Sequence, residues 1–419
     1  MSNNEEQVAG QSPLEELHHQ DSMRNPVDRE QTEDVDRPGA PSGGSSDDSL
    51  GRLELEYLPW GTDDAEGATA CRVLATCGWV ELEYAIMRRG CGMLDQPNRG
   101  TVVLSGDDRQ AVLENMVSQG LEGLSPTSAR EAFLTDRKGR VQADLLIAAL
   151  DEEILLDVDI NQVDLVTTLL SDHIFTEDVQ VRNGSEDWYR IGVHGPDAAS
   201  ILGSFGDVPE SSLSSSCLEI AGVAALAVRR DQVSTPGFEL FLPRAGVVTA
   251  WEAIRSTGGI RGIRVRTVGW YAFNTARIEG GTPLFNIDFA SNNLPHESSL
   301  IESRVSFTKG CYPGQEVVAR MHHLGAPKQA LRGLKIKADV LPVAGSQVFA
   351  AEDETLAEAV GVITSSTISP LSGATPIAIA MLKKRVVASG SMVRVHAEGI
   401  ASEAVVCDLD ELVSSGADA

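Results

Sequence analysis

Two spacings of apolar residues recur along the chain and predict a mixture of strands and helices. Residues 101–117 open with a β-branched run, pass through Ser-Gly-Asp, and continue with apolar residues on one helical face. Residues 189–205 repeat this order, with His-Gly-Pro-Asp before the helix. The two units predict related halves of one α+β domain; because strands capped into helices are common, a chance recurrence is the alternative.

Further strand patterns lie between and after these units. Residues 131–158 predict antiparallel strands joined at turns over residues 136–139 and 151–153. Two more strand-like runs and two helices follow, as far as Gly281. From Leu331 onward, short β-rich runs alternate with Gly, Ser and Pro, which predicts a small C-terminal β-barrel.

The N-terminal segment has a different composition. Residues 1–50 are rich in Ser, Gly, Asn, Asp and Glu and lack apolar periodicity, so we expect a disordered acidic tail. The predicted organisation is therefore a tail over residues 1–50, an α+β region over residues 51–325, and a β-barrel over residues 326–419.

Acidic residues dominate the charge of the whole chain. The net charge is −27, and residues 1–50 contribute only twelve Asp/Glu and three Arg to it, so most of the excess lies in the folded part. A dispersed acidic surface is typical of proteins from salt-loving organisms. It disfavours extended nucleic-acid binding unless a local patch such as Lys383, Lys384 and Arg385 overrides it.

Cysteine content and hydropathy indicate the compartment. Six cysteines without a C-x-x-C pair favour a reducing environment over a disulfide scaffold. No secretory leader and no long apolar run are apparent, so we expect a cytoplasmic protein without membrane partners.

Cys311 is the first candidate for chemistry, within the segment FTKGCYPGQEVVARMHH (residues 307–323). A lone cysteine is most often a small buried hydrophobe. Here Lys309 and a helix predicted to begin after the Pro-Gly turn would both favour the thiolate. His322 and His323 lie about three turns away on that helix, which disfavours a direct base or a compact metal site, so we predict no metal.

Two further stretches contain polar groups that suit ligand binding. Residues 274–297 form a polar segment that either converges on a planar heterocycle or is a surface loop capped by glycines. Glu239, inside an apolar run, faces either solvent or a pocket. No phosphate-binding loop, H-E-x-x-H or G-x-S-x-G motif occurs in the sequence, which leaves nucleotide hydrolysis, metalloprotease and α/β-hydrolase activities without support.

Residues 309–316, KGCYPGQE, match the K-G-C-Y-x-G-Q-E signature of the YgfZ family of folate-binding proteins. The chain resembles this family over roughly residues 75–410. The family shares a superfamily with the glycine-cleavage T-protein, an aminomethyltransferase. The resemblance implies an α+β fold, with two related subdomains in a cloverleaf around a folate channel and a C-terminal β-barrel.

The resemblance also implies a function and a set of site residues. The chain would be a tetrahydrofolate-binding accessory protein that supports iron–sulfur cluster assembly or repair in client enzymes, including tRNA-modifying enzymes. Its partners would be folate and iron–sulfur client or assembly proteins. The implied functional residues are the thiol of Cys311 with Lys309 beside it, and, for folate, Glu239, Arg277, Asp288, Asp144 and Gln315.

One departure separates the chain from T-proteins. T-proteins have an Asp-Asp pair whose first member is catalytic, and Ala143-Asp144 stands at that place here. T-proteins also have a G-Y-T-G-E-D-G run where this chain has DQVSTPG, residues 231–237. The missing carboxylate argues against methylene transfer in glycine cleavage, and the retained cysteine motif favours the accessory role. The alternatives are a folate-dependent aminomethyl- or methyltransferase and a scaffold whose folate site has decayed.

Overall fold

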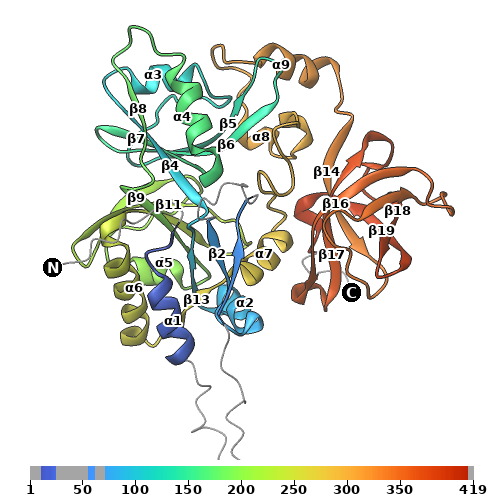
Figure 1. The fold of residues 1–419 in the computed structure, drawn as a ribbon, viewed down its shortest axis with the longest axis horizontal. Helices are drawn as coiled ribbons and strands as arrows, with labels where there is room; N and C mark the ends of the chain where they lie inside the picture. The colour runs from blue at the N-terminus through green and yellow to red at the C-terminus, as the bar shows by residue number, and fades with distance from the viewer. Residues whose placement is uncertain (1–10, 25–54, 62–70, 414–419) are drawn as a thin grey trace, which may run out of the picture.

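The computed structural model describes residues 11–24, 55–61 and 71–413 (Figure 1). They form two α+β halves with stacked sheets, and a closed β-barrel beside them. The predicted fold class and the predicted barrel are confirmed. In the described residues, no helix is long and apolar enough to cross a membrane.

The first half is a five-stranded antiparallel sheet in the order β5-β6-β7-β4-β8. Its strands are β4 (Arg99–Ser105), β5 (Ala129–Thr135), β6 (Val141–Ala149), β7 (Glu153–Asp159) and β8 (Gln180–Asn183). Helices α3 (Arg109–Glu114) and α4 (Val163–Ser171) cover one face. Aliphatic side chains of β4, β6 and β7 form the core under these helices.

The second half is a six-stranded sheet in the order β10-β11-β12-β9-β3-β13, in which only the β3–β13 pair is parallel. Its strands are β3 (Cys91–Asp95), β9 (Trp188–His194), β10 (Ser215–Ile220), β11 (Val223–Arg229), β12 (Gly237–Pro243) and β13 (Val265–Val268). One face packs on α5 (Ala198–Leu202) and α6 (Val247–Arg261), and the β3–β13 edge packs on α2 (Val80–Arg89) and α7 (Trp270–Glu279). A hairpin-like pair, β1 (Glu56–Pro59) and β2 (Arg72–Thr76), lies beside α7.

The predicted repeat of strand, turn and helix is present in both halves, as β4–α3 and β9–α5. Gly106 and Gly195 occupy equivalent turn positions, with φ of +100° and +125°. A Cβ atom at Gly106 would collide with the backbone carbonyl of Asp178, and one at Gly195 with the backbone carbonyl of Gly90. Each half therefore uses a glycine where strand turns into helix.

The two sheets stack face to face through an apolar layer. Leu146 and Leu155 of the first sheet pack there with Leu226, Val228 and Phe241 of the second. This contact fixes the relative position of the halves, and the candidate site lies beside it.

The C-terminal barrel closes in the order β14-β17-β16-β15-β18-β19. Its strands are β14 (Gln329–Ile336), β15 (Gln347–Ala350), β16 (Ala359–Ser369), β17 (Thr375–Lys383), β18 (Met392–Ala397) and β19 (Ile400–Cys407). Two helices precede it, α8 (Ile301–Arg304) and α9 (Gln315–Leu324), and Figure 1 shows α9 between the first sheet and the barrel.

Part of the expected disordered tail is folded. Residues 15–24 form α1 (Glu15–Arg24), and Leu14 and Leu17 are buried in the core of the second half. Ser12 also donates a hydrogen bond to the buried carboxylate of Asp95. The prediction of disorder is wrong for residues 11–24, because two leucines in one helical turn are too few to produce a visible period. The remainder of residues 1–50 lies outside the described residues.

Candidate functional site

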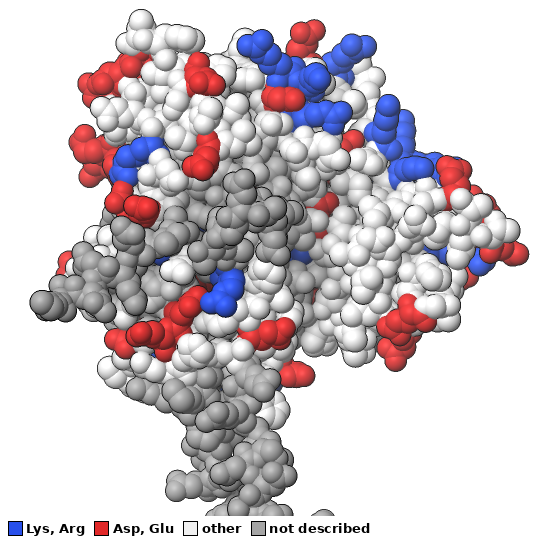
Figure 2. All heavy atoms as spheres, viewed as in Figure 1, with Lys and Arg blue, Asp and Glu red and all other residues white. Residues whose placement is uncertain are grey.

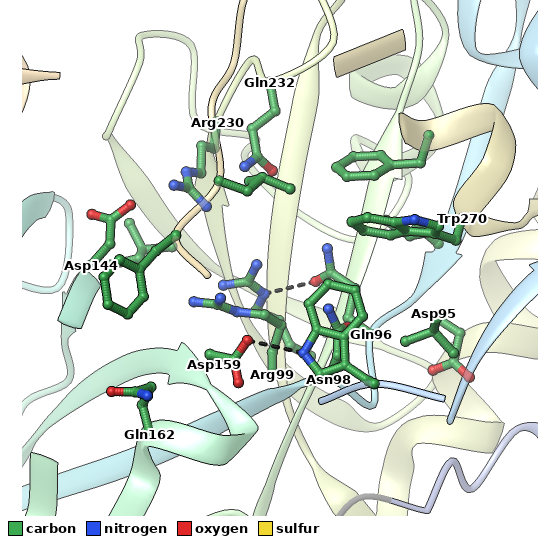
Figure 3. A pocket seen from close by; sticks show the side chains of 18 of the residues that line it. Asp95, Gln96, Asn98, Arg99, Asp144, Asp159, Gln162, Arg230, Gln232 and Trp270 are labelled. Atoms are coloured by element: carbon green, nitrogen blue, oxygen red, sulfur yellow. Dashed lines mark hydrogen bonds between the residues drawn. The ribbon is translucent and has the colours of Figure 1, made fainter. Parts of the chain in front are cut away.

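A pocket with about 820 Å³ of free space, including its opening to solvent, lies between the two halves (Figure 3). The polar lining residues are Asp95, Gln96, Asn98, Arg99, Asp144, Asp159, Gln162, Arg190, Arg230 and Gln232.

Aromatic side chains form one wall of the pocket. Trp60 follows β1 and Trp270 begins α7, and their rings meet edge to face with centroids 4.9 Å apart. The Trp60 indole donates a hydrogen bond to Asp159 Oδ2 at 2.9 Å, which fixes its orientation. Phe273, one turn along α7, extends the wall. Such a wall offers stacking surface to a planar ring.

Asp144 lies on the side of the pocket opposite Trp270 (Figure 3). Alternation along β6 turns Asp144 toward the second sheet, on the same face as Leu146, whereas the methyl group of Ala143 packs into the core under α3 and α4. Arg304 of α8 donates to Asp144 Oδ1 at 2.8 Å. The pocket therefore has a carboxylate at residue 144, next to Ala143, which stands where T-proteins have an Asp.

Glu239 lies behind the pocket wall. It is fully buried on β12, with Oε2 3.2 Å from Arg190 Nε, and the Gln232 amide donates to its Oε1 at 2.7 Å. Arg190 also pairs with Asp157, yet burial lowers its pKa against the pull of both carboxylates. Neither sequence-based orientation of Glu239 is observed, because its carboxylate faces other buried side chains and holds two lining residues in place.

Glu131 joins two arginines that reach the pocket region. Arg230 donates to its Oε1 at 2.6 Å, and Arg304 pairs with its other oxygen. Burial alone would raise the pKa of Glu131, but the two guanidinium groups outweigh burial and lower it. The carboxylate is therefore ionised, and it neutralises the cation of Arg230 at the pocket surface.

Arg277 and Asp288, two of the predicted folate ligands, lie away from this pocket. Both side chains are completely buried and form an ion pair. Arg277 Nη2 also donates to Ser365 Oγ at 2.6 Å, and Thr364 donates to Asp288 Oδ1 at 2.7 Å. These contacts connect α7 and the loop after it to β16 of the barrel.

The Cys311 segment also lies apart from the pocket lining. Cys311 is exposed, and the helix predicted to begin just after it is confirmed as α9. Lys309 Nζ is directed to the segment that follows α3, donating to the carbonyl oxygens of Val117 and Gln119 at 2.7 and 3.2 Å, and burial lowers the pKa of this amine. Gln315 donates to its own loop, at Gly310 O. Lys309 and Gln315 thus shape the loop that presents the thiol.

Sequence reasoning missed the aromatic wall and the polar lining at its foot. Trp60 and Trp270 belong to segments 210 residues apart, and their only signal was the rarity of tryptophan, which occurs five times in the chain. Gln162 gave no signal. Gln162 lines the pocket, and its buried Oε1 has no hydrogen-bond partner within the described part of the protein.

Two α+β halves around a pocket, with a barrel attached, define the T-protein fold. A crystal structure of the glycine cleavage system aminomethyltransferase T from Bartonella henselae superposes with a TM-score of 0.73, at 20% identity, over 86% of this chain and 94% of that one. Residues 75–309, more than half of the chain, match the family described as GCVT N-terminal domain. The chain therefore belongs to the glycine-cleavage T-protein superfamily.

Curated relatives agree with this assignment. An aminomethyltransferase of Thermoanaerobacter sp. (strain X514) is 25% identical over 69% of this chain and 77% of its own length. One from Corynebacterium jeikeium (strain K411) is 27% identical over 74% of this chain and 83% of its own length. The narrower assignment to the YgfZ family stays a prediction, carried by residues 309–316.

Proposed function

We propose that the protein binds tetrahydrofolate in the pocket and transfers a one-carbon unit between the folate and an amine, as an aminomethyltransferase or methyltransferase of the T-protein type. The observation that carries the proposal is the pairing of an aromatic wall with a carboxylate, Asp144, on the opposite side of one pocket. The relatives named aminomethyltransferase support the same reaction class.

The lining residues fit a pterin. Trp60 and Trp270 offer a stacking surface, and a reduced pterin presents several N–H donors along its edge. Gln162 also lines this space, and its buried Oε1 has no hydrogen-bond partner among the described residues, which costs free energy. Tetrahydrofolate, when bound, supplies the nitrogen atoms that carry the one-carbon unit.

Asp144 is the residue we assign to the reacting amine. Its ion pair with Arg304 holds the side chain in one orientation. From there an ionised carboxylate can accept an N–H hydrogen bond and stabilise positive charge that develops on a nitrogen. The replacement of Asp by Ala at residue 143 therefore does not remove the carboxylate from the pocket.

The assignment of Asp144 is tested with Asp144→Asn. We expect tetrahydrofolate affinity by calorimetry to change less than about tenfold, while transfer from N-methyl or aminomethyl donors, followed by mass spectrometry of the folate, falls about 100-fold or more. Asp151→Asn, at an exposed acid in the turn after β6, is the matched control and should behave as the unsubstituted protein. Lack of tetrahydrofolate binding by the unsubstituted protein would refute the proposal.

A second candidate function is the accessory role in iron–sulfur protein maturation. It is favoured by the octapeptide around Cys311 and by the exposure of that thiol outside the pocket. In this role folate binds in the pocket, and Cys311 acts on a client or assembly protein at the surface.

Cys311→Ala tests the accessory role, with Cys217→Ala, at another exposed free cysteine, as control. We expect the Cys311 variant to fold and bind tetrahydrofolate normally, while iron–sulfur enzymes, including those that modify tRNA, lose activity in a strain that carries it. Unchanged activity of those enzymes would eliminate the role.

A further inference from the structure

A cluster of positive charge stands out on this acidic chain. Figure 2 shows Lys and Arg gathered on the part of the surface where Figure 1 places α9 and the adjoining end of the barrel. We call this cluster the basic ridge and define it by six exposed side chains: Arg137, Lys138, Arg140, Arg320, Lys328 and Lys384.

Three segments far apart in sequence build the ridge. The β5–β6 turn packs against the start of α9, where Thr135 Oγ1 donates to Pro313 O at 2.6 Å and a Cβ atom at Gly314 would collide with the backbone of Gly139. After α9, Lys384 N donates to Lys328 O at 2.8 Å, which joins the ends of β14 and β17. The fold therefore brings these cations together, although the sequence separates them.

The charges of the ridge are available to a partner. Among the described residues, Arg137, Lys138, Arg320, Lys328 and Lys384 have no ion-pair partner. The neighbouring Lys383 and Arg385 differ, because both pair with Glu358. On a chain of net charge −27, unpaired like charges at one place repel one another and attract an anionic surface.

An apolar stripe on α9 runs through the ridge. Val317 is 37% exposed and Leu324 84% exposed, seven residues apart and thus on one helical face, with Met321 between them. Val318 is the one fully buried side chain of this helix. Val317 and Leu324 thus place exposed apolar side chains on the helix that also carries Arg320 of the ridge.

We propose that the basic ridge and the α9 stripe form the docking site for an acidic protein. Protein interfaces combine an apolar centre with a charged rim, and here the α9 stripe supplies the centre and the ridge the rim. A nucleic acid fits less well, because its phosphates do not bind an apolar side chain such as Leu324. The acidic remainder of the surface also repels an extended strand. The site does not depend on folate binding.

A partner docked here would also contact the loop that carries Cys311. The thiol precedes α9 by four residues and is exposed, so a partner that covers the N-terminal end of the helix meets this loop. The partner surface we infer is therefore acidic, with an exposed apolar group for Leu324.

Site-specific photo-crosslinking of the full chain in its own cells tests the proposal. Benzoyl-phenylalanine is placed at Leu324, and at Ile260 of α6, 86% exposed, as the control position. We expect an acidic protein to crosslink at residue 324 and not at residue 260. Crosslinks to nucleic acid, or no crosslink beyond the control, would overturn the proposal.

Charge reversal then tests whether the ridge determines binding. The crosslinked protein is purified and titrated by calorimetry against Lys138→Glu/Lys384→Glu and against a control reversal at two other exposed arginines, Arg89→Glu/Arg264→Glu. We expect the ridge variant to bind about tenfold more weakly or worse, and the control to change by less than about threefold. Affinity should fall as salt rises. Equal effects of the two reversals, with thermal unfolding unchanged in both variants, would refute the role of the ridge.

Discussion

At the scale of single residues, the site depends on buried charges that satisfy one another. Glu131 is the central example, because it pairs with Arg230 at the pocket and with Arg304, which in turn holds Asp144. A buried carboxylate shared by two guanidinium groups is tolerated, because a buried carboxylate without a cation, or buried guanidinium groups without a carboxylate, would cost more free energy. Glu131 thus positions the proposed reacting carboxylate without touching the pocket.

Glu131→Gln should reveal this role through its pH dependence. The folded-state pKa is lowered, so the ion pairs stabilise the protein above the pKa of the unfolded state, about 4.3, and this contribution disappears as pH falls through the folded value. We expect the substitution to lower the free energy of unfolding at pH 7 by about 3–5 kcal/mol, because it leaves two buried guanidinium groups underpaired. Urea titrations should show that this difference from the unsubstituted protein shrinks progressively as the pH is lowered below about 4.

The control for this measurement is Glu152→Gln, at an exposed glutamate in the turn between β6 and β7. Its effect on the free energy of unfolding should stay within about 0.5 kcal/mol over the same pH range. A Glu131→Gln effect that does not shrink as the pH is lowered below about 4 would show that packing, and not ionisation, accounts for the loss.

At the scale of elements, the sequence predicted what local periodicity determines. The repeated strand-turn-helix units, the start of α9 and the barrel strands follow from side-chain spacing and from glycines such as Gly106 and Gly195. The pocket could not be predicted in this way, because it depends on which faces meet. Trp60 and Trp270 become neighbours only in the folded chain, and the place of Asp144 follows from a strand alternation that only the stacked sheets orient.

At the scale of the whole molecule, the barrel is fixed to the α+β halves by a buried polar contact inside an apolar interface. Phe285 and Phe289 pack with Leu331 and Ile379 of the barrel. The Arg277–Asp288 pair lies nearby and binds hydroxyl groups of β16. The resemblance implies that this pair binds folate, and its observed contacts suit a structural link between the domains.

The variants Arg277→Met and Arg277→Met/Asp288→Leu distinguish these two roles. The single change leaves the Asp288 carboxylate buried without its cation, so we expect it to lower the free energy of unfolding by about 3–5 kcal/mol, and the double change to recover much of that loss. If the pair only connects the barrel to the α+β halves, tetrahydrofolate affinity by calorimetry should be close to normal in the double variant, because neither side chain lines the pocket. If the pair binds folate, the double variant would be stable in urea and yet fail to bind it. Stability and affinity measured on the same two proteins therefore separate a structural arginine from a ligand-binding one.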